Sequence, residues 1–208
     1  MAAERGFVTV VSQLLDNGAD ADGLCAGGAA AGATPLVVAV NHGHVECVAQ
    51  LLQAGADQNI CDVRRNSPIQ LAVLNDDVAC VRLLLEQSQG PVDVADLLRL
   101  SIISGAGSDV VEALVKSGRC DVEDGGCESA CRPLMLAALK GRADVVDLLL
   151  DCRADVDAEL MDEHDRQRLT ALHFAVSAAV DLHCRADYCR RYIYVNHSHT
   201  ALHSYVAP

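Results

Sequence analysis

Apolar residues recur along the chain in short blocks with helical spacing, and one block appears more than once. The stretch TPLVVAVNHGHVECVAQLL, residues 34–52, has a counterpart thirty-three residues later in SPIQLAVLNDDVACVRLLL, residues 67–85. Both contain a hydroxyl residue followed by Pro, an Ala five residues after the hydroxyl, a Cys-Val pair and a closing Leu-Leu. A repeat period of roughly 20 to 50 residues is typical of proteins that stack one small structural unit.

Each block predicts two helices separated by a tight turn. Thr34 or Ser67 is placed to cap the first helix, and the following Pro costs nothing there because the first backbone N–H groups have no partner within a helix. Gly43 can take the positive φ that ends a helix, and VECVAQLLQ then shows a second set of apolar residues at helical spacing. The next residues, AGAD, supply a glycine terminator and turn chemistry. We therefore expect each unit to consist of helix, turn, helix and loop.

These residues resemble the ankyrin repeat, whose pattern combines Thr-Pro-Leu-His, Gly-His, Leu-Leu and Gly-Ala-Asp. Copies start near residues 34, 67, 96, 132 and 170, and the copy near 96 is divergent because it lacks Thr-Pro. Residues 1–24 match the later part of a unit and predict a partial repeat. The resemblance implies an all-α fold, an ankyrin-repeat solenoid of stacked helix-turn-helix units with hairpin-like loops. Another helical solenoid is the main alternative, and the 33-residue step argues against it.

Three stretches depart from the repeat pattern. Residues 25–33 are a Gly/Ala-rich loop insert, and residues 159–168, ELMDEHDRQR, are a charged insert; both are expected to be surface loops. Repeats are expected up to residue 176, and residues 177–208 form a degenerate or non-repeat C-terminal tail. In this tail CRAD at Cys184 repeats CRAD at Cys152, and TALH at Thr200 repeats TALH at Thr170. A damaged repeat and an altered terminus both remain open.

Charge and hydrophobicity narrow the choice of partners. The formal charge of −13 comes from 29 acidic and 16 basic residues, whereas nucleic-acid binding draws much of its affinity from Lys and Arg contacts to phosphate. The longest apolar runs, such as PLVVAV, are far shorter than the roughly 20 residues that span a bilayer. The start MAAERGFVTVVSQLL lacks the apolar stretch of a signal peptide. The sequence predicts a cytoplasmic or nuclear protein with protein partners, and no binding to nucleic acid or membrane.

The ten cysteines raise the question of disulfides or metal binding. Cys47 and Cys80 occupy the same place in two copies, where a small hydrophobic residue would pack equally well, so we interpret most cysteines as reduced core thiols. A zinc-stabilised tail is an alternative, because Cys184, Cys189, His199 and His203 have the spacing C-x4-C-x9-H-x3-H. That spacing is only loosely similar to a zinc finger. We expect no metal site and no cofactor.

No motif of a catalytic site occurs in the chain. The sequence contains no G-x-S-x-G, no H-E-x-x-H and no glycine-rich phosphate or dinucleotide loop. We therefore predict that the protein is not an enzyme. The resemblance implies instead a protein-protein interaction module, an adaptor or scaffold that binds its partner through the concave groove and the loop tips. A substrate-recruiting fragment of a larger protein, such as a ubiquitin-ligase adaptor, is the alternative.

The resemblance also implies which residues face the partner. In the family, residues beside the capping hydroxyl project from the loop tips, and residues at the end of each first helix line the groove. The matching positions here are Asn41, His42, Arg64, Arg65, Asn66, Asn75, Glu128, Ser129, Lys140, Arg166 and Gln167. Each could equally be an ordinary solvated residue. Arg64 and Arg65 are the strongest candidates, because paired arginines on an acidic protein can bind a carboxylate in a bidentate manner. Arg65 replaces the usual Gly of the family, so we expect a distorted turn there.

Overall fold

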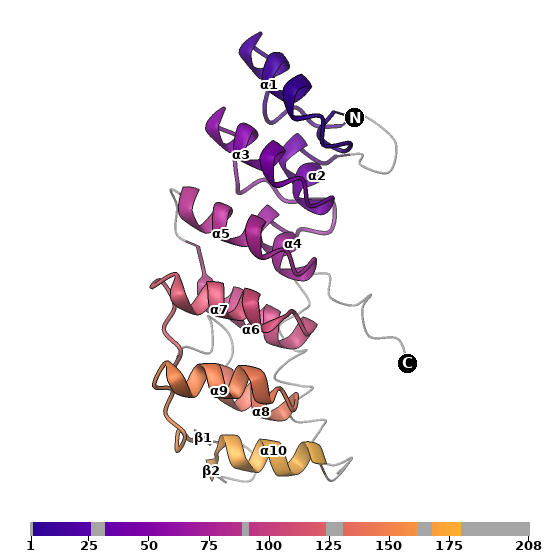
Figure 1. Ribbon diagram of the computed structural model, residues 1–208. Coiled ribbons are helices and arrows are strands. Elements are labelled where there is room, and N and C mark those ends of the chain that lie inside the picture. The colour runs from indigo at the N-terminus through magenta and orange to yellow at the C-terminus, as the bar shows by residue number, and fades with distance from the viewer. Residues whose placement is uncertain (1, 26–31, 89–91, 124–130, 162–167, 180–208) are drawn as a thin grey trace. The chain divides into compact units, whose positions relative to one another are not determined.

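The computed structural model describes residues 2–25, 32–88, 92–123, 131–161 and 168–179, with Met161 and residues 177–179 described by their backbone (Figure 1). The chain divides into two compact units, Met1–Val92 and the part from Asp93 onward. Each unit is a stack of helix pairs. The predicted all-α ankyrin architecture is confirmed within both.

The described residues of the first unit form two complete helix pairs and one further helix. Its helices are α1 (Val8–Asp16), α2 (Pro35–Asn41), α3 (Val45–Gln53), α4 (Pro68–Leu74) and α5 (Val78–Gln87). Helix α2 packs against α3, and α4 against α5. Between neighbouring pairs, first helices contact first helices and second helices contact second helices, since α2 lies on α4, and α3 contacts both α1 and α5. The same surfaces therefore meet at each step of the stack.

The second unit repeats this arrangement. Its elements are α6 (Val94–Ser104), α7 (Ser108–Lys116), α8 (Pro133–Leu139), α9 (Ala143–Asp151), β1 (Leu160–Met161), β2 (Arg168–Leu169) and α10 (Ala171–Ala179). The pairs are α6 with α7 and α8 with α9, and α10 packs against α8. The two strands form an antiparallel ribbon in which Leu160 lies opposite Leu169. The two ends of the charged insert thus pair as a short antiparallel ribbon directly before α10.

Helices α2, α4, α5 and α6 begin where a side chain accepts a hydrogen bond from one of the first backbone N–H groups. The hydroxyl of Thr34 accepts a hydrogen bond from the Val37 N–H at 3.3 Å. Ser67 forms a full capping box, because its hydroxyl accepts from the Gln70 N–H and the Gln70 side chain accepts from the Ser67 N–H. The divergent third copy has no Thr-Pro, and Asp93 takes over the cap by accepting from the Asp96 N–H at 3.0 Å. The carboxylate of Asp93 thus caps α6 in the way that the hydroxyl of Thr34 caps α2.

Backbone conformation repeats together with the sequence. The turn inside each helix pair has a positive φ at Gly43, Asp76, Gly105 and Gly141, and the turn after the second helix has one at Gly18, Gly55, Gly118 and Arg153. The loop tips that precede α2 and α4 have positive φ at Gly32 and Arg65, again thirty-three residues apart. The expected distortion at Arg65 is therefore not found, because Arg65 adopts the same left-handed conformation as the Gly that it replaces.

The core consists of small aliphatic side chains and a few thiols. Of the seven cysteines in the described residues, Cys47, Cys80 and Cys131 are buried, Cys120 is half-buried, and the others are exposed in loops or at helix ends. The interpretation of most cysteines as core thiols is therefore wrong for the exposed ones. Burial, with the hydrogen bond and charge of Asp77, raises the pKa of Cys80 to about 12. That thiol is protonated at neutral pH and behaves as a small apolar side chain.

Candidate protein-binding surface

The loop tip before α4, residues 62–66, is held rigid by one carboxylate. Asp62 Oδ1 accepts hydrogen bonds from the backbone N–H of Arg64 at 2.8 Å and of Asn66 at 2.7 Å. The Asp62 N–H in turn donates to the Asn66 carbonyl, and the Arg65 N–H donates to the Asp62 carbonyl. Asp and Asn side chains commonly fix turns in this way. The backbone of the 62–66 tip is therefore fixed before any partner binds.

Two arginine side chains project from this rigid tip. Arg64 and Arg65 are both exposed, and no hydrogen bond or ion pair of their guanidinium groups is found within the described part of the chain. Val63 beside them is 76% exposed. The adjacent Cys61 has a raised pKa because of burial and the charge of Asp62, whereas Arg65 acts in the opposite direction. The 62–66 tip thus presents two cations and one apolar side chain.

The ends of the first helices present a second group of predicted residues. Asn41, His42 and Asn75 are exposed, and the Asn75 amide donates to the Asn41 carbonyl at 3.4 Å. His42 donates through Nδ1 to the Val38 carbonyl at 2.9 Å. Its ring is stacked on His44, with ring centroids 6.1 Å apart and an interplanar angle of 10°. This surface links two neighbouring repeats of the first unit.

The structure describes seven of the eleven predicted contact residues. Asn66 is half-buried, and its N–H and side-chain amide are both used by Asp62, so it stabilises the turn. Lys140 belongs to the second unit, where it is exposed at the C-terminal end of α8. Glu128, Ser129, Arg166 and Gln167 lie outside the described residues. None of these placements tests binding, so all eleven stay predictions.

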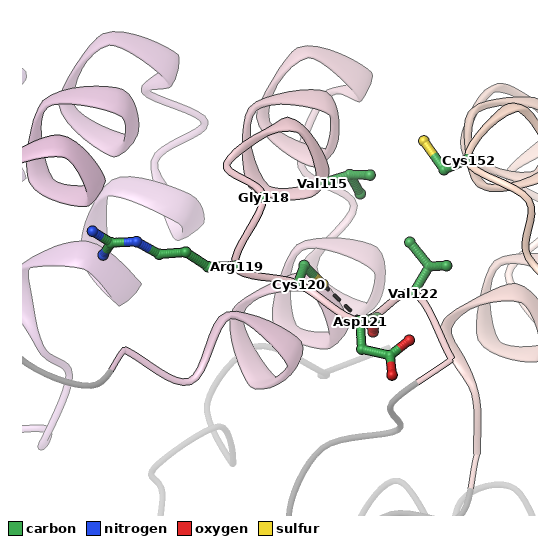
Figure 2. Close-up of a pocket in the computed structure, with 7 residues that line it drawn as sticks. All are labelled: Val115, Gly118, Arg119, Cys120, Asp121, Val122 and Cys152. Atoms are coloured by element: carbon green, nitrogen blue, oxygen red, sulfur yellow. Dashed lines mark hydrogen bonds between the residues drawn. The ribbon is translucent and has the colours of Figure 1, made fainter.

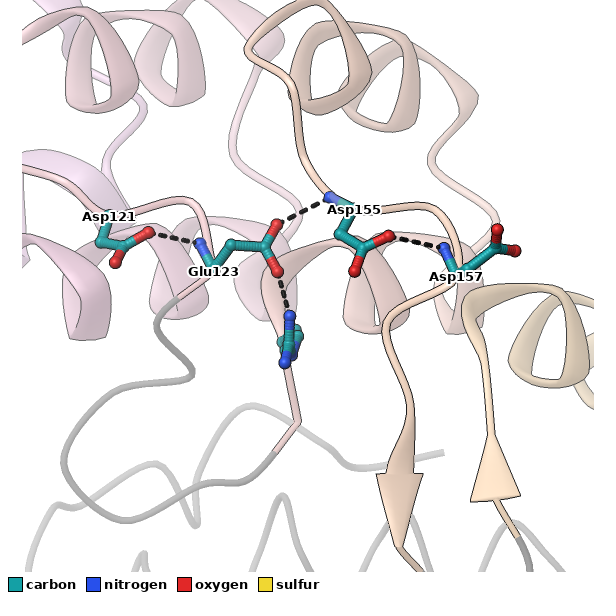
Figure 3. Close-up of polar contacts among 5 residues, drawn as sticks. Asp121, Glu123, Asp155 and Asp157 are labelled. Carbon is teal, nitrogen blue, oxygen red and sulfur yellow. Dashed lines mark hydrogen bonds and ion pairs between the residues drawn. The ribbon is translucent and has the colours of Figure 1, made fainter.

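The loops after the second helices carry a ladder of carboxylates. In the first unit Asp22 accepts from the Asp57 N–H of the next repeat at 2.9 Å. In the second unit Glu123 does the same for the Asp155 N–H at 2.8 Å, and it also pairs with Arg132 (Figure 3). Asp121 and Asp155 each fix their own loop by accepting from the N–H two residues later. The carboxylates therefore link successive repeats.

A shallow cavity of about 550 Å³ lies beside this ladder in the second unit (Figure 2). It is lined by Val115, Gly118, Arg119, Cys120, Asp121, Val122 and Cys152. The Cys120 thiol donates to the Asp121 carbonyl at 3.7 Å. Within the described residues, His, Cys, Asp and Glu side chains form no group of three or more that could hold a metal ion. The cavity has a mixed apolar and polar lining.

Sequence reasoning missed the residues that shape the 62–66 tip. Asp62 was not singled out, although an Asp at the start of a short polar loop is a common turn signal. Val63 was also missed, although an apolar residue at the tip of such a loop is unusual. Its Cγ1 lies against Gly32 of the preceding tip, where an added Cβ would be only 3.2 Å away. Neighbouring loop tips of the first unit therefore touch each other.

The described geometry is that of a repeat protein whose loops and helix ends are exposed and whose core is built mainly from apolar side chains. Family models agree with it. A model of three ankyrin repeats matches residues 1–96, and a single ankyrin repeat matches residues 131–159. Together these stretches make up more than half of the 208 residues. The chain belongs to the ankyrin-repeat family, and ankyrin repeats indicate a protein-interaction module.

The chain matches part of much longer curated relatives. The chain is 30% identical over 167 residues to ankyrin repeat and SAM domain-containing protein 6 of Danio rerio, covering 76% of the chain and 21% of that protein. It is 31% identical over 160 residues to the E3 ubiquitin-protein ligase XBAT33 of Arabidopsis thaliana, covering 76% of the chain and 29% of the ligase. The chain thus spans less than a third of either relative.

Solved structures show the same fold. The human ASB11 ankyrin repeat domain is similar with a TM-score of 0.62 and 25% identity, over 84% of this chain and 74% of that one. The ankyrin repeat domain of Bcl-3, a member of the IkappaB protein family, is similar with a TM-score of 0.70 and 24% identity, over 86% and 79%. No helix among the described residues is long and apolar enough to cross a membrane.

Proposed function

We propose that this chain is a non-catalytic adaptor or scaffold that binds an acidic segment of a partner protein through the 62–66 tip. The observation that supports this proposal is the difference between the backbone and the side chains of that tip. Its backbone is fixed by Asp62, while the guanidinium groups of Arg64 and Arg65 are exposed. Little conformational entropy of the loop is lost on binding, because the turn is already formed.

The charge of the whole protein supports a specific role for these two arginines. At a formal charge of −13, the chain repels acidic partners at long range. A guanidinium binds a carboxylate with two parallel hydrogen bonds, which gives a short-range contact with defined geometry. Two such groups beside the apolar Val63 suit a partner segment that carries carboxylates next to an apolar side chain. Asn41, His42 and Asn75 are proposed to extend this contact within the first unit.

The test begins with capture of partners by the wild-type protein and their identification by mass spectrometry. The dissociation constant of each purified partner is then measured for wild type, for Arg64→Ala/Arg65→Ala, and for a matched control, Arg5→Ala/Arg82→Ala. The control removes the same charge from exposed positions elsewhere in the first unit. We expect the tip variant to lose about tenfold or more in affinity, as contact arginines often do.

The control separates a local contact from a general charge effect. If Arg5→Ala/Arg82→Ala weakens binding as much as the tip variant, the effect comes from net charge and the proposal is wrong. Unchanged affinity of the tip variant would also contradict it. If binding of a partner depends on Lys140 and not on the 62–66 tip, the binding surface lies in the second unit.

A second candidate function is recruitment of a substrate to an activity carried by a larger protein. The observation that favours it is that relatives include proteins named as E3 ubiquitin-protein ligases, of whose length the chain matches less than a third. In that case the captured partner would be modified in cells that contain this chain and would stay unmodified when Arg64 and Arg65 are replaced. Ubiquitin-remnant mass spectrometry measures this directly.

A further inference from the structure

The basic residues of this chain are almost all arginines. Of the 16 Lys and Arg residues, only Lys116 and Lys140 are lysines. A guanidinium stays protonated in proteins, whereas the side-chain amine of lysine is the acceptor for acetyl groups and for ubiquitin. The sequence therefore offers two side-chain amines to a donor of a thioester-activated carboxyl group, and the structure describes both of them.

Lys116, the last residue of α7, is held in an ion pair. Its Nζ donates a hydrogen bond to Glu112 Oε1, one turn earlier in the same helix. The Lys116 side chain is 71% exposed, so reagents reach it from solvent, but the pair must open before the nitrogen can attack a carbonyl carbon. Exposed ion pairs are weak, so we expect only a severalfold reduction in the reactivity of Lys116.

Lys140 lies at the C-terminal end of α8, where the helix fixes its backbone. Its N–H donates to the Leu136 carbonyl at 3.0 Å, and the residue is exposed. The same position is occupied by His42 after α2 and by Asn75 after α4, both of them exposed. Within the part of the chain that the structure describes, Lys140 Nζ forms no hydrogen bond or ion pair. Its amine therefore projects into solvent from a fixed point.

The carboxylate that lies nearest to Lys140 in the following sequence is already bound. Both oxygens of Asp144 accept hydrogen bonds from the Arg142 guanidinium, at 3.0 and 2.7 Å. This contact lowers the pKa of Asp144. Because Arg142 occupies both oxygens, Asp144 does not compete for the amine of Lys140. The two lysines thus differ, since the carboxylate partner of Lys116 lies in its own helix.

We propose that Lys140 is the preferred site of acyl modification of this chain, with a thioester as the donor. The lone pair of the Lys140 amine attacks the carbonyl carbon of the thioester. A C–N amide bond forms as the C–S bond breaks, and the thiol leaves with the proton that the nitrogen gives up. A small acyl thioester and the C-terminal thioester of ubiquitin share this chemistry, and the attached mass distinguishes them.

The modification changes the charge at the end of α8. An amide at Lys140 Nζ carries no charge, so a cation is lost at a position that is also predicted to contact a partner. The 62–66 tip, on which the proposed function depends, lies in the first unit and contains no lysine. Modification of Lys140 therefore alters the surface of the second unit and leaves the arginines of the tip unchanged.

The first experiment compares the reactivity of the two amines in the full-length protein. Acetyl-CoA is the probe, and mass spectrometry quantifies acetylation of each lysine at low conversion. We expect Lys140 to be acetylated about three- to fivefold faster than Lys116, and Glu112→Gln to bring the two rates to within about twofold. Asp109→Asn is the matched control, because it removes an exposed carboxylate of α7 that does not contact Lys116, and it should leave the ratio unchanged.

The second experiment isolates the full-length protein from cells and searches its peptides for acylated lysine and for the ubiquitin remnant. We expect either adduct on Lys140, retained in Lys116→Arg and lost in Lys140→Arg, which keeps the charge. Three results would overturn the proposal: Lys116 reacts with acetyl-CoA as fast as Lys140, Glu112→Gln leaves the ratio unchanged, or Lys140 carries neither adduct in cells.

Discussion

At the scale of single residues, the repeat tolerates non-glycine residues at positions that require a positive φ. Arg65, Asp76 and Arg153 have φ values of 65°, 57° and 65°, at places where other repeats have Gly. An L-residue in this region costs about 1–2 kcal/mol, because its Cβ crowds the following carbonyl oxygen. At Arg65 the hydrogen bonds of Asp62 offset that cost. One of the three non-glycine residues in this conformation is thus also a proposed binding residue.

This strain leads to a stability prediction. Replacement of Arg65 by Gly should increase the free energy of unfolding by about 0.5–1 kcal/mol, because the relief of strain exceeds the entropy that Gly adds to the unfolded chain. Urea denaturation followed by circular dichroism measures it. Arg64→Gly is the control, since Arg64 has no positive φ, and it should lower stability. A stability loss in Arg65→Gly would mean that the guanidinium has a structural partner.

At the scale of elements, some helices begin at a side-chain cap and others begin without one. The capping box of Ser67 satisfies two backbone groups at once, whereas Arg132 at the start of α8 makes no capping bond with its side chain. The same sequence position, directly before Pro, therefore contributes differently to stability in two repeats. Helix α8 depends more on its packing against α9 and α10 than on its cap.

The capping box predicts the effect of one hydroxyl. Ser67→Ala should lower the free energy of unfolding by about 1 kcal/mol, because it removes the acceptor for the Gln70 N–H. Ser67→Asp is the control and should retain most of the stability, since a carboxylate can accept the same bond. Thermal and urea denaturation both report the change. Equal loss in the two variants would show that the cap contributes little and that packing holds the start of α4.

Much of the fold can be predicted from the sequence, because helix starts and turns are determined by residues close together in the chain. The Thr-Pro and Gly signals predict helix starts and turns, and the 33-residue period predicts which faces meet. The conformation of Arg65 could not be predicted, because it depends on Asp62 bonds that form only once the loop has closed. The exposure of Leu172 and Val176 on α10 could not be predicted either, since burial depends on which segment lies opposite. For the site, sequence identified the exposed arginines and missed Asp62 and Val63.

At the scale of the whole molecule, charge opposes compactness. A formal charge of −13 creates self-repulsion that salt screens over about 10 Å at 0.1 M ionic strength. Salt also weakens exposed ion pairs such as Lys116 with Glu112 and Arg168 with Glu159. Such pairs contribute at most about 1 kcal/mol each, so relief of the repulsion should be the larger effect.

We therefore expect salt to stabilise the protein. The melting temperature should rise by about 2–4 °C between roughly 20 mM and roughly 300 mM NaCl, because the Debye length becomes much shorter over this range of ionic strength. Differential scanning calorimetry measures this shift. Sucrose at the same osmolarity is the control for solvent effects that do not involve charge. A melting temperature that falls with salt would show that ion pairs contribute more to stability than the net charge removes.

The loop closure at Cys25 has a consequence for how this protein can change over generations. The Cys25 N–H donates to the Ala33 carbonyl and the Gly32 N–H donates to the Cys25 carbonyl, so both ends of the intervening Gly/Ala segment are joined at one point. Asp22 separately fixes the step to the next repeat. Residues can therefore be gained or lost between Cys25 and Gly32 while the repeats keep their spacing. Since the entropy cost of closing a loop grows only slowly with its length, changes in length at this place should cost little stability.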